Sequence, residues 1–130
     1  MKTQNWLLKQ SSTQPDKVAI TDGQKQLTFS ELRDVVAANI GRLNQLKPGK
    51  FVGILTDNTL IGYEIAMTVL ASGRTIVWLN WRLAKDELDR QMADSRLTCC
   101  LVADSLVRPT MDKRFTSFEH FLQLPAQDGQ

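Results

Sequence analysis

Three short apolar runs along the chain are separated by two longer segments in which apolar and polar positions follow a helical spacing. The runs are residues 51–55, 75–79 and 97–103, and they lack the strict apolar–polar alternation of a half-exposed strand. The segments between them are residues 60–72 and 84–95. This order predicts a β-α-β-α-β unit with a parallel sheet and right-handed crossovers, in which residues 75–79 form a central strand.

The two helical segments differ in expected burial. Residues 60–72 are apolar on most sides, with Glu64 the main exception, so this helix is expected to be largely buried. Gly73 follows it and suits the left-handed position after a helix end. Residues 84–95 are more polar, and their expected inward positions are Leu88 and Met92.

Another helix is expected from residue 28, because Thr28 and Glu31 have the spacing of a capping box. In that motif each side chain accepts a hydrogen bond from a backbone N–H at the helix start. Leu27 and Leu32 are spaced to form a hydrophobic staple across the cap. Apolar residues then recur at helical spacing until Pro48-Gly49 stops the helix.

The first thirty residues predict a short helix and a hairpin. The helix is expected over residues 5–12, and strands over 18–21 and 26–28 flank Asp22-Gly23, a pair typical of tight turns. The predicted fold class is therefore α/β, with a three-layer-type parallel sheet that follows a short helix and a β-hairpin.

Domain organisation follows from where this signal weakens. Residues 1–103 are expected to form one α/β subdomain. Residues 104–130 are expected to be a weakly structured tail whose strand and short helix pack on a neighbour, because aromatic residues recur there after Pro109.

Composition indicates a folded domain and argues against two classes of partner. The chain has 130 residues, 42% hydrophobic and 23% charged, which is ordinary for one globular domain. Its net charge of +2 arises from interleaved signs, which disfavours nucleic-acid binding. No run reaches the ~18 apolar residues of a membrane span, and the N-terminus lacks the apolar core of a secretory signal. A cytoplasmic protein without a membrane partner is expected.

The two cysteines, Cys99 and Cys100, are adjacent in an apolar run. Neighbouring side chains on a strand point to opposite faces, so a disulfide between them would be strained. We interpret both as small buried side chains in a reducing compartment. A metal or redox site is the alternative, but the chain has no C-x-x-C and no histidine cluster.

Two polar residues, Asp57 and His120, could have functional roles, but a structural role explains each of them more simply. Asp57 follows a predicted strand, as a phospho-acceptor would, but the acidic pair and lysine of such a site are not evident. Residues 56–59 supply cap candidates for the next helix, and Asp57 beside Asn58 is interpreted as an Asx cap. His120 is the single histidine and lies in the tail, where a surface or packing role is expected.

Further candidates are aromatic, acidic or glycine-rich. Trp78 and Trp81 could form a ligand shelf. Trp78 lies in an apolar strand and is expected in the core, whereas the sequence does not decide between a core and a ligand-binding role for Trp81. The acids of residues 86–94 are mixed with basic residues on a solvated helix. The chain has no dinucleotide or phosphate-binding glycine loop. The sequence thus assigns no catalytic, cofactor-binding or metal-binding residue.

An ordered set of segments nevertheless resembles a known superfamily. The AMP-forming acyl-CoA synthetases, of the adenylate-forming superfamily, resemble this chain over roughly residues 5–103. Residues 20–24 and 80–94 look most like the acid–CoA ligases of bacterial menaquinone synthesis. The segments that carry the resemblance are Asn5-Trp6-Leu7, residues 15–20, residues 27–32, Asp57-Asn58 and Asn80-Trp81-Arg82-Leu83.

This resemblance implies the N-terminal subdomain of a ligase that uses ATP, magnesium and coenzyme A. The family's phosphate loop, acidic magnesium ligand and catalytic lysine have no matching positions here. The chain is therefore expected to be inactive alone, to hold no cofactor itself and to partner with the rest of the ligase. Apolar surface exposed by that absence would also permit a homodimer.

Two other functions stay open. One is a stand-alone flavodoxin-like module that binds a nucleotide or coenzyme A. The other is a structural or interaction module that assembles with a partner chain through its tail.

Overall fold

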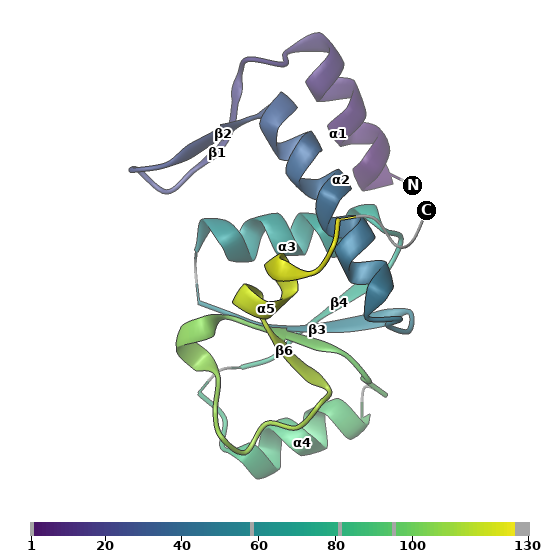
Figure 1. Cartoon of the computed structure of the whole chain (residues 1–130), viewed down its shortest axis with the longest axis vertical. Helices are drawn as coiled ribbons and strands as arrows, with labels where there is room; N and C mark the ends of the chain where they lie inside the picture. The colour runs from purple at the N-terminus through teal and green to yellow at the C-terminus, as the bar shows by residue number, and fades with distance from the viewer. Residues whose placement is uncertain (1, 58, 81, 95, 127–130) are drawn as a thin grey trace.

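The computed structural model describes residues 2–57, 59–80, 82–94 and 96–126. A helix and hairpin come first, and the long helix α2 (Phe29–Gln45) joins them to the sheet (Figure 1). None of the helices in these ranges has the length and apolar character needed to cross a bilayer. The N-terminal elements are α1 (Lys2–Thr13), β1 (Val18–Thr21), β2 (Gln26–Thr28) and α2 (Phe29–Gln45).

The remaining elements build a four-stranded sheet in the order β4-β3-β5-β6, with every neighbouring pair parallel. The α/β fold class and the parallel sheet preceded by a helix and hairpin are confirmed. These elements are β3 (Phe51–Leu55), α3 (Leu60–Ala71), β4 (Thr75–Trp78), α4 (Lys85–Asp94), β5 (Cys100–Val102), the 3-10 turn η1 (Asp104–Leu106), β6 (Phe115–Ser117) and α5 (Phe118–Gln123).

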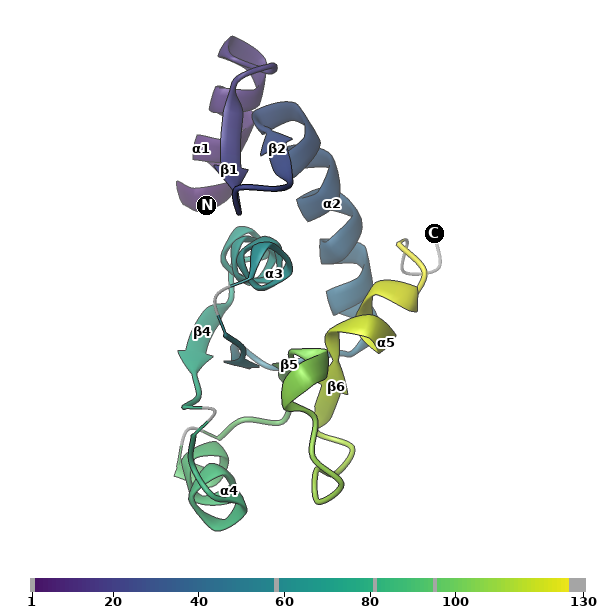
Figure 2. The ribbon, with the colours of Figure 1, turned by 90° about the vertical axis from the view of Figure 1, so that its left-hand side faces the viewer.

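Helices cover the two faces of the sheet, and the strand order explains why. The chain moves from β3 to β4 in one direction and then returns past β3 to β5. Because crossovers are right-handed, this reversal puts α3 and α4 on opposite faces. Figure 2 shows α4 alone on one side, with α3, α2 and α5 on the other.

Three buried clusters follow these layers. One lies between the sheet and the helices α2, α3 and α5, and includes Ile65 and Phe121. A second lies under α4, where Leu88 and Met92 point inward as predicted. The third joins α1, the hairpin and α2 to α3, and includes Leu32 and Ala71. The N-terminal motif thus lies against the side of α3 that faces away from the sheet (Figure 1).

The start of α2 confirms the capping box. The hydroxyl of Thr28 accepts from the backbone N–H of Glu31 at 3.1 Å, and the Glu31 carboxylate accepts from the N–H of Thr28 at 2.9 Å. Leu27 packs against the cluster that contains Leu32, as a staple requires. Gly73 has a φ of 88° and ends α3 in the expected left-handed conformation.

The prediction that residues 75–79 form a central strand is wrong. In the described residues β4 pairs with β3 alone and lies at the edge of the sheet. Its last residue, Trp78, is 58% exposed, so the core position expected for this tryptophan is also wrong. The physical reason is the crossover from β4 to β5, which passes β3 and leaves β3 between its two neighbours.

Residues 104–126 continue the sheet and the core of the chain. β6 pairs with β5 in register, Leu101 opposite Thr116, so the expected boundary after residue 103 falls between two strands of one sheet. Phe118 and Phe121 of α5 are buried in the cluster over the sheet. The strand and short helix expected in this segment therefore pack on the chain's own sheet.

Candidate functional site

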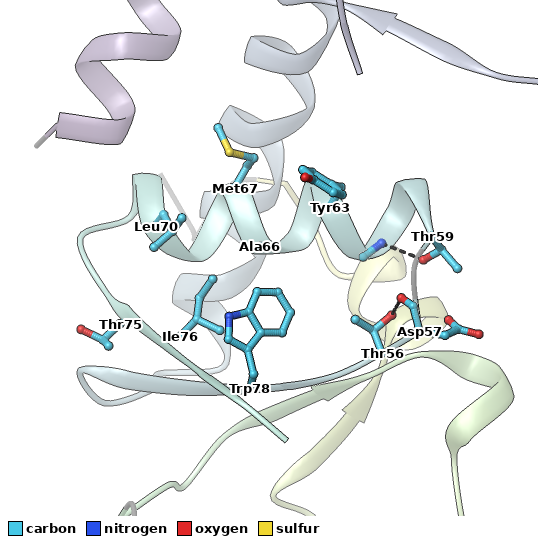
Figure 3. Close-up of a pocket in the computed structure, with 11 residues that line it drawn as sticks. Thr56, Asp57, Thr59, Tyr63, Ala66, Met67, Leu70, Thr75, Ile76 and Trp78 are labelled. Atoms are coloured by element: carbon cyan, nitrogen blue, oxygen red, sulfur yellow. Dashed lines mark hydrogen bonds between the residues drawn. The ribbon is translucent and has the colours of Figure 1, made fainter. Parts of the chain in front are cut away.

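A groove of about 470 Å³ runs between α3 and the edge strand β4 (Figure 3). We call it the α3–β4 groove. Its wall is apolar along most of its length, and polar side chains gather at one end, where β3 leads into α3. Its lining residues are Thr56, Asp57, Thr59, Gly62, Tyr63, Ala66, Met67, Leu70, Thr75, Ile76 and Trp78.

Two aromatic side chains dominate the groove. Trp78 and Ile76 are two positions apart on β4, so they share a face of the strand. The indole ring of Trp78 and the side chain of Ile76 both point toward α3 (Figure 3). Tyr63 lies on the outer side of α3 and is 63% exposed. It also lines a second hollow of about 580 Å³ between α3 and the hairpin, where Trp6 and Asp22 lie. Tyr63 therefore lines both the apolar groove and a second, more polar hollow.

The polar end of the groove is organised by the start of α3. Thr59 is the N-cap, because its hydroxyl accepts from the N–H of Gly62 at 3.0 Å. The hydroxyl of Thr56 donates to the carbonyl oxygen of Asp57 at 2.8 Å. A Cβ at residue 62 would lie 2.9 Å from the Thr56 oxygen, so glycine permits this close approach. These contacts satisfy local backbone groups and fix the shape of the turn.

The predicted Asx cap at Asp57 is therefore wrong. The chain runs further before α3 begins, and Thr59, within the expected 56–59 stretch, takes the capping role. The Asp57 side chain is exposed at the mouth of the groove. Asn58, the other residue of that prediction, lies outside the described residues.

The carboxyl ends of parallel strands are where such sheets usually bind ligands, at the point where the strand order reverses. Here that point lies between β3 and β5, and the residues that follow these strands include Asp57 and Asp104. Asp104 accepts from the N–H of Glu119 at 2.9 Å and so anchors the start of α5. Two carboxylates at the carboxyl ends of these strands disfavour the binding of a phosphate group there.

The cysteines have the environment of structural residues. Cys99 and Cys100 are both buried and free, as interpreted from the sequence. Burial raises the pKa of the Cys99 thiol to about 11, with Arg74 acting in the opposite direction. Burial also raises the pKa of Cys100 strongly. Both thiols are therefore protonated and poor nucleophiles near neutral pH.

The remaining candidates are spread over the surface. The side chain of His120 is exposed on α5, and the acids of α4 face solvent apart from Asp89, which pairs with Arg114 at 3.4 Å. In the ranges that the structure describes, no three His, Cys, Asp or Glu side chains come together as a metal site would require. Trp81, the other half of the proposed ligand shelf, lies outside those ranges.

Of the residues considered from the sequence, the structure brings Asp57 and Trp78 to one groove, while His120 does not line it. Tyr63 was missed, and its signal was available: it is the single tyrosine, in a helix otherwise rich in aliphatic residues. The position of Tyr63 relative to β4 depends on the sheet order, which the sequence did not provide.

Sequence comparison places the chain among known enzymes. The family model described as "AMP-binding enzyme" matches residues 7–127. The 2-succinylbenzoate–CoA ligase of Bacillus cytotoxicus is 31% identical over 126 residues, which is 95% of this chain and 26% of that protein. The corresponding ligase of Geobacillus kaustophilus is 31% identical over 104 residues, 78% of this chain and 21% of that protein.

Structural comparison gives the same fold. The o-succinylbenzoate coenzyme A synthetase (MenE) of Bacillus subtilis, in complex with AMP, superposes with a TM-score of 0.82 at 20% identity. That match covers 97% of this chain and 34% of the solved chain. The N-terminal subdomain of Klebsiella oxytoca NpsA, in complex with 3-hydroxyanthranilyl-AMSN, superposes with a TM-score of 0.82 at 18% identity, over 98% of this chain and 33% of that one.

The chain spans about a quarter of the first of these curated relatives, while the family model spans nearly all of the chain. The match includes the helix–hairpin motif, the parallel sheet and α5. This chain therefore belongs to the AMP-binding enzyme family.

Proposed function

We propose that this chain is the N-terminal α/β subdomain of an AMP-forming carboxylate–CoA ligase whose acyl acid is o-succinylbenzoate. The observation that carries the proposal is the continuous match to 2-succinylbenzoate–CoA ligases, at 31% identity over 126 residues. Such a ligase would act in menaquinone biosynthesis, and a cytoplasmic location would suit that role.

The reaction implied by this assignment has two steps. The carboxylate of the acid attacks the α-phosphorus of ATP and pyrophosphate leaves, which gives an acyl-adenylate. The sulfur of coenzyme A then attacks the acyl carbon, AMP leaves with the electron pair of the broken bond, and the thiol proton passes to solvent. A solved structure of the B. subtilis relative is described as a complex with ATP and a magnesium ion.

The residues described here do not fit ATP or magnesium on their own. Asp57 and Asp104 follow the carboxyl ends of β3 and β5, and the described residues include no cluster of metal ligands. We infer that this subdomain supplies a scaffold, and that the groups that hold ATP, magnesium and coenzyme A belong to the rest of the ligase. On this proposal the chain is inactive alone.

Two measurements test the proposal. The purified chain is assayed for pyrophosphate release with ATP, magnesium and o-succinylbenzoate, and it should show none above buffer. A fusion in which residues 7–126 replace the matching segment of the B. cytotoxicus ligase should regain that release. The control is the same fusion with benzoate as the acid. Acyl-adenylate formed by the isolated chain, or a folded fusion without activity, would contradict the proposal.

The α3–β4 groove is the observation that favours a second candidate, a stand-alone binding module. Its apolar wall and aromatic rings could hold a planar ligand, although Asp57 at its mouth disfavours phosphates. Calorimetric titration of the isolated chain with ATP and with coenzyme A separates the two functions. Micromolar binding of either ligand would favour the module over the inactive subdomain.

A further inference from the structure

Basic residues that are far apart in the sequence gather at the edge of the sheet where its strands begin. Lys50 directly precedes β3, and Arg74 directly precedes β4. Arg96 and Lys113 lie in the turns that lead into β5 and β6. Because all four strands are parallel, their starts lie at the same edge. We call Lys47, Lys50, Arg74, Arg96 and Lys113 the amino-edge row.

Hydrogen bonds hold three members of this row close to one another. The N–H of Thr75 donates to the carbonyl oxygen of Lys50 at 2.9 Å, so β3 and β4 begin side by side. The Arg74 guanidinium donates to the Oδ1 of Asn44 at 3.4 Å. The N–H of Lys47 donates to the carbonyl oxygen of Asn44 at 3.1 Å. The end of α2 thus joins Lys47 to the starts of both strands.

The amino-edge row is exposed and only partly balanced by acids. All of its members are exposed apart from Arg74, which is half-buried. The turns that carry the row and the helix ends before them contain two acids, Asp94 and Asp112. Asp112 pairs with Arg114 at 2.8 Å, so a basic residue outside the row already matches its charge. The row therefore presents an excess of positive charge.

The ends of helices account for part of this charge. Helices α2, α3 and α4 all end at this edge of the sheet (Figure 1), and a helix end carries roughly half an elementary negative charge. Lys47, Arg74 and Arg96 follow these three ends, so each full positive charge exceeds the adjacent dipole. Lys50 and Lys113 directly precede strands or their turns and add further charge. The row thus attracts anions beyond what the helix dipoles require.

An exposed aromatic side chain lies within the row. Phe51, the first residue of β3, is 40% exposed, and the Nζ of Lys50 lies 5.9 Å from the centroid of its ring. Neither of the two hollows described above is lined by a member of the row. An open row of cations beside an aromatic ring suits a broad anionic surface, and this combination is typical of proteins that lie on a bilayer.

We propose that the amino-edge row binds the surface of a membrane that contains anionic lipids. The cations lie against the phosphate groups of the lipids, and the ring of Phe51 enters the interface between headgroups and acyl chains. Clusters of about four to eight Lys and Arg residues at a membrane surface are typical of binding to anionic lipids. A peripheral contact requires no spanning segment, so it agrees with the absence of a spanning helix from the described residues.

Vesicle sedimentation of the purified chain measures this binding. The probes are vesicles of equal parts phosphatidylglycerol and phosphatidylcholine, and vesicles of phosphatidylcholine alone. The chain should sediment with the anionic vesicles at about 0.1 M salt and be released at about 1 M, where the Debye length falls from about 10 Å to about 3 Å. Absence of binding to the anionic vesicles, or equal binding to both kinds, would overturn the proposal.

Matched charge variants locate the contact. Lys47→Gln with Lys50→Gln removes two charges from the row, while Lys9→Gln with Lys17→Gln removes two exposed charges from the N-terminal motif. The first pair should weaken partitioning onto anionic vesicles at least about tenfold, because each basic residue at the surface contributes several-fold. The second pair should change it less than about twofold, because distant charges are screened at about 0.1 M salt.

A second pair within the row keeps the test decisive if the first pair alters the turn before β3. Arg96→Gln with Lys113→Gln should weaken partitioning to a similar extent, and far-UV circular dichroism verifies the fold of each variant. The proposal is overturned if neither row pair weakens binding more than the Lys9 and Lys17 pair does, since binding then follows net charge alone.

Soluble polyglutamate is the probe for an acidic polypeptide as the partner. The chain should bind anionic vesicles more tightly than polyglutamate of equal total charge, because only the bilayer can take up the ring of Phe51. Tighter binding to polyglutamate would overturn the lipid proposal and assign the row to an acidic protein. These measurements need no pyrophosphate release, so their outcome is independent of the proposed ligase function.

Discussion

The guanidinium of Arg42 in α2 donates from Nε to the carbonyl oxygen of Leu124 at 3.0 Å, across 82 positions of sequence. The same guanidinium donates from Nη1 to the Oδ1 of Asn39 at 2.7 Å. Arg42 therefore ties the end of α5 to the helix that joins the N-terminal motif to the sheet. This contact adds to the burial of Phe118 and Phe121, which holds α5 over the core.

Replacing Arg42 should loosen this end of the protein. Arg42→Met removes the donors to Leu124 and Asn39, and a part-buried acceptor left without its partner costs about 1–3 kcal/mol. Urea unfolding measures the loss of free energy of unfolding. Arg33→Met is the matched control on the same helix, since Arg33 pairs with its exposed neighbour Asp34 and should cost less than about 1 kcal/mol. Equal losses in both variants would show that the Leu124 contact contributes nothing.

The capping box at the start of α2 gives a second prediction. Thr28→Ala removes the side-chain acceptor for the Glu31 N–H and should lower the free energy of unfolding by about 0.5–2 kcal/mol. Thr28→Ser keeps a hydroxyl and should stay close to the original protein. Thermal or urea unfolding of the two variants is compared. A Ser variant as unstable as the Ala variant would argue that the threonine methyl group, rather than the cap, matters.

Truncating two aromatic residues to alanine should lower the free energy of unfolding by very different amounts. Phe121 is fully buried, and Phe121→Ala should cost about 3–5 kcal/mol through lost burial and the cavity it leaves. Trp78 is 58% exposed at a sheet edge, and Trp78→Ala should cost less than about 1 kcal/mol in the isolated chain. Urea unfolding of both variants checks the difference. A large loss at Trp78 would mean that this ring belongs to the chain's own core.

Alkaline pH should destabilise the protein through its cysteines. Burial raises the pKa of Cys99 to about 11 from its ordinary value of 9.0, and the pKa of Cys100 is raised as well. The unfolded thiols ionise near pH 9 while the folded ones do not, so stability falls as pH rises from about 9 towards 11. Urea titrations at several pH values measure this slope. The variant with Cys99→Ala and Cys100→Ala should show a flatter slope over the same range.

The half-buried carboxyl of Glu64 should make the stability of the protein depend on pH between acidic and neutral conditions. Burial raises the pKa of its carboxyl above the ordinary 4.5, and the charge of Lys25 partly offsets this. A raised folded pKa gives stability below pH 4.5 that is lost as pH rises through the folded value. Glu64→Gln should therefore be more stable than the original protein at pH 7 and no more stable below pH 4.5. Urea unfolding of both proteins at pH 7 and below pH 4.5 measures the difference, and equal stability of the two at pH 7 would contradict the prediction.

Local features of this protein could be predicted from the sequence because short-range physics determines them. The cap of α2 needs Thr28 and Glu31 three positions apart, and the turn after α3 needs Gly73 at a positive φ. The inward positions Leu88 and Met92 follow from helical spacing alone. Each of these depends on residues within one or two turns of each other, so no knowledge of the sheet was required.

The position of each strand in the sheet depended on the tertiary structure. Apolar runs look alike in central and edge strands, and only the crossover past β3 shows that β4 lies at the edge with Trp78 exposed. The choice of Thr59 as cap depended on where β3 releases the chain. The α3–β4 groove is lined by residues 56–78 alone. It lies at a sheet edge because β5 pairs with the other side of β3, and that pairing of distant segments is not encoded in local spacing.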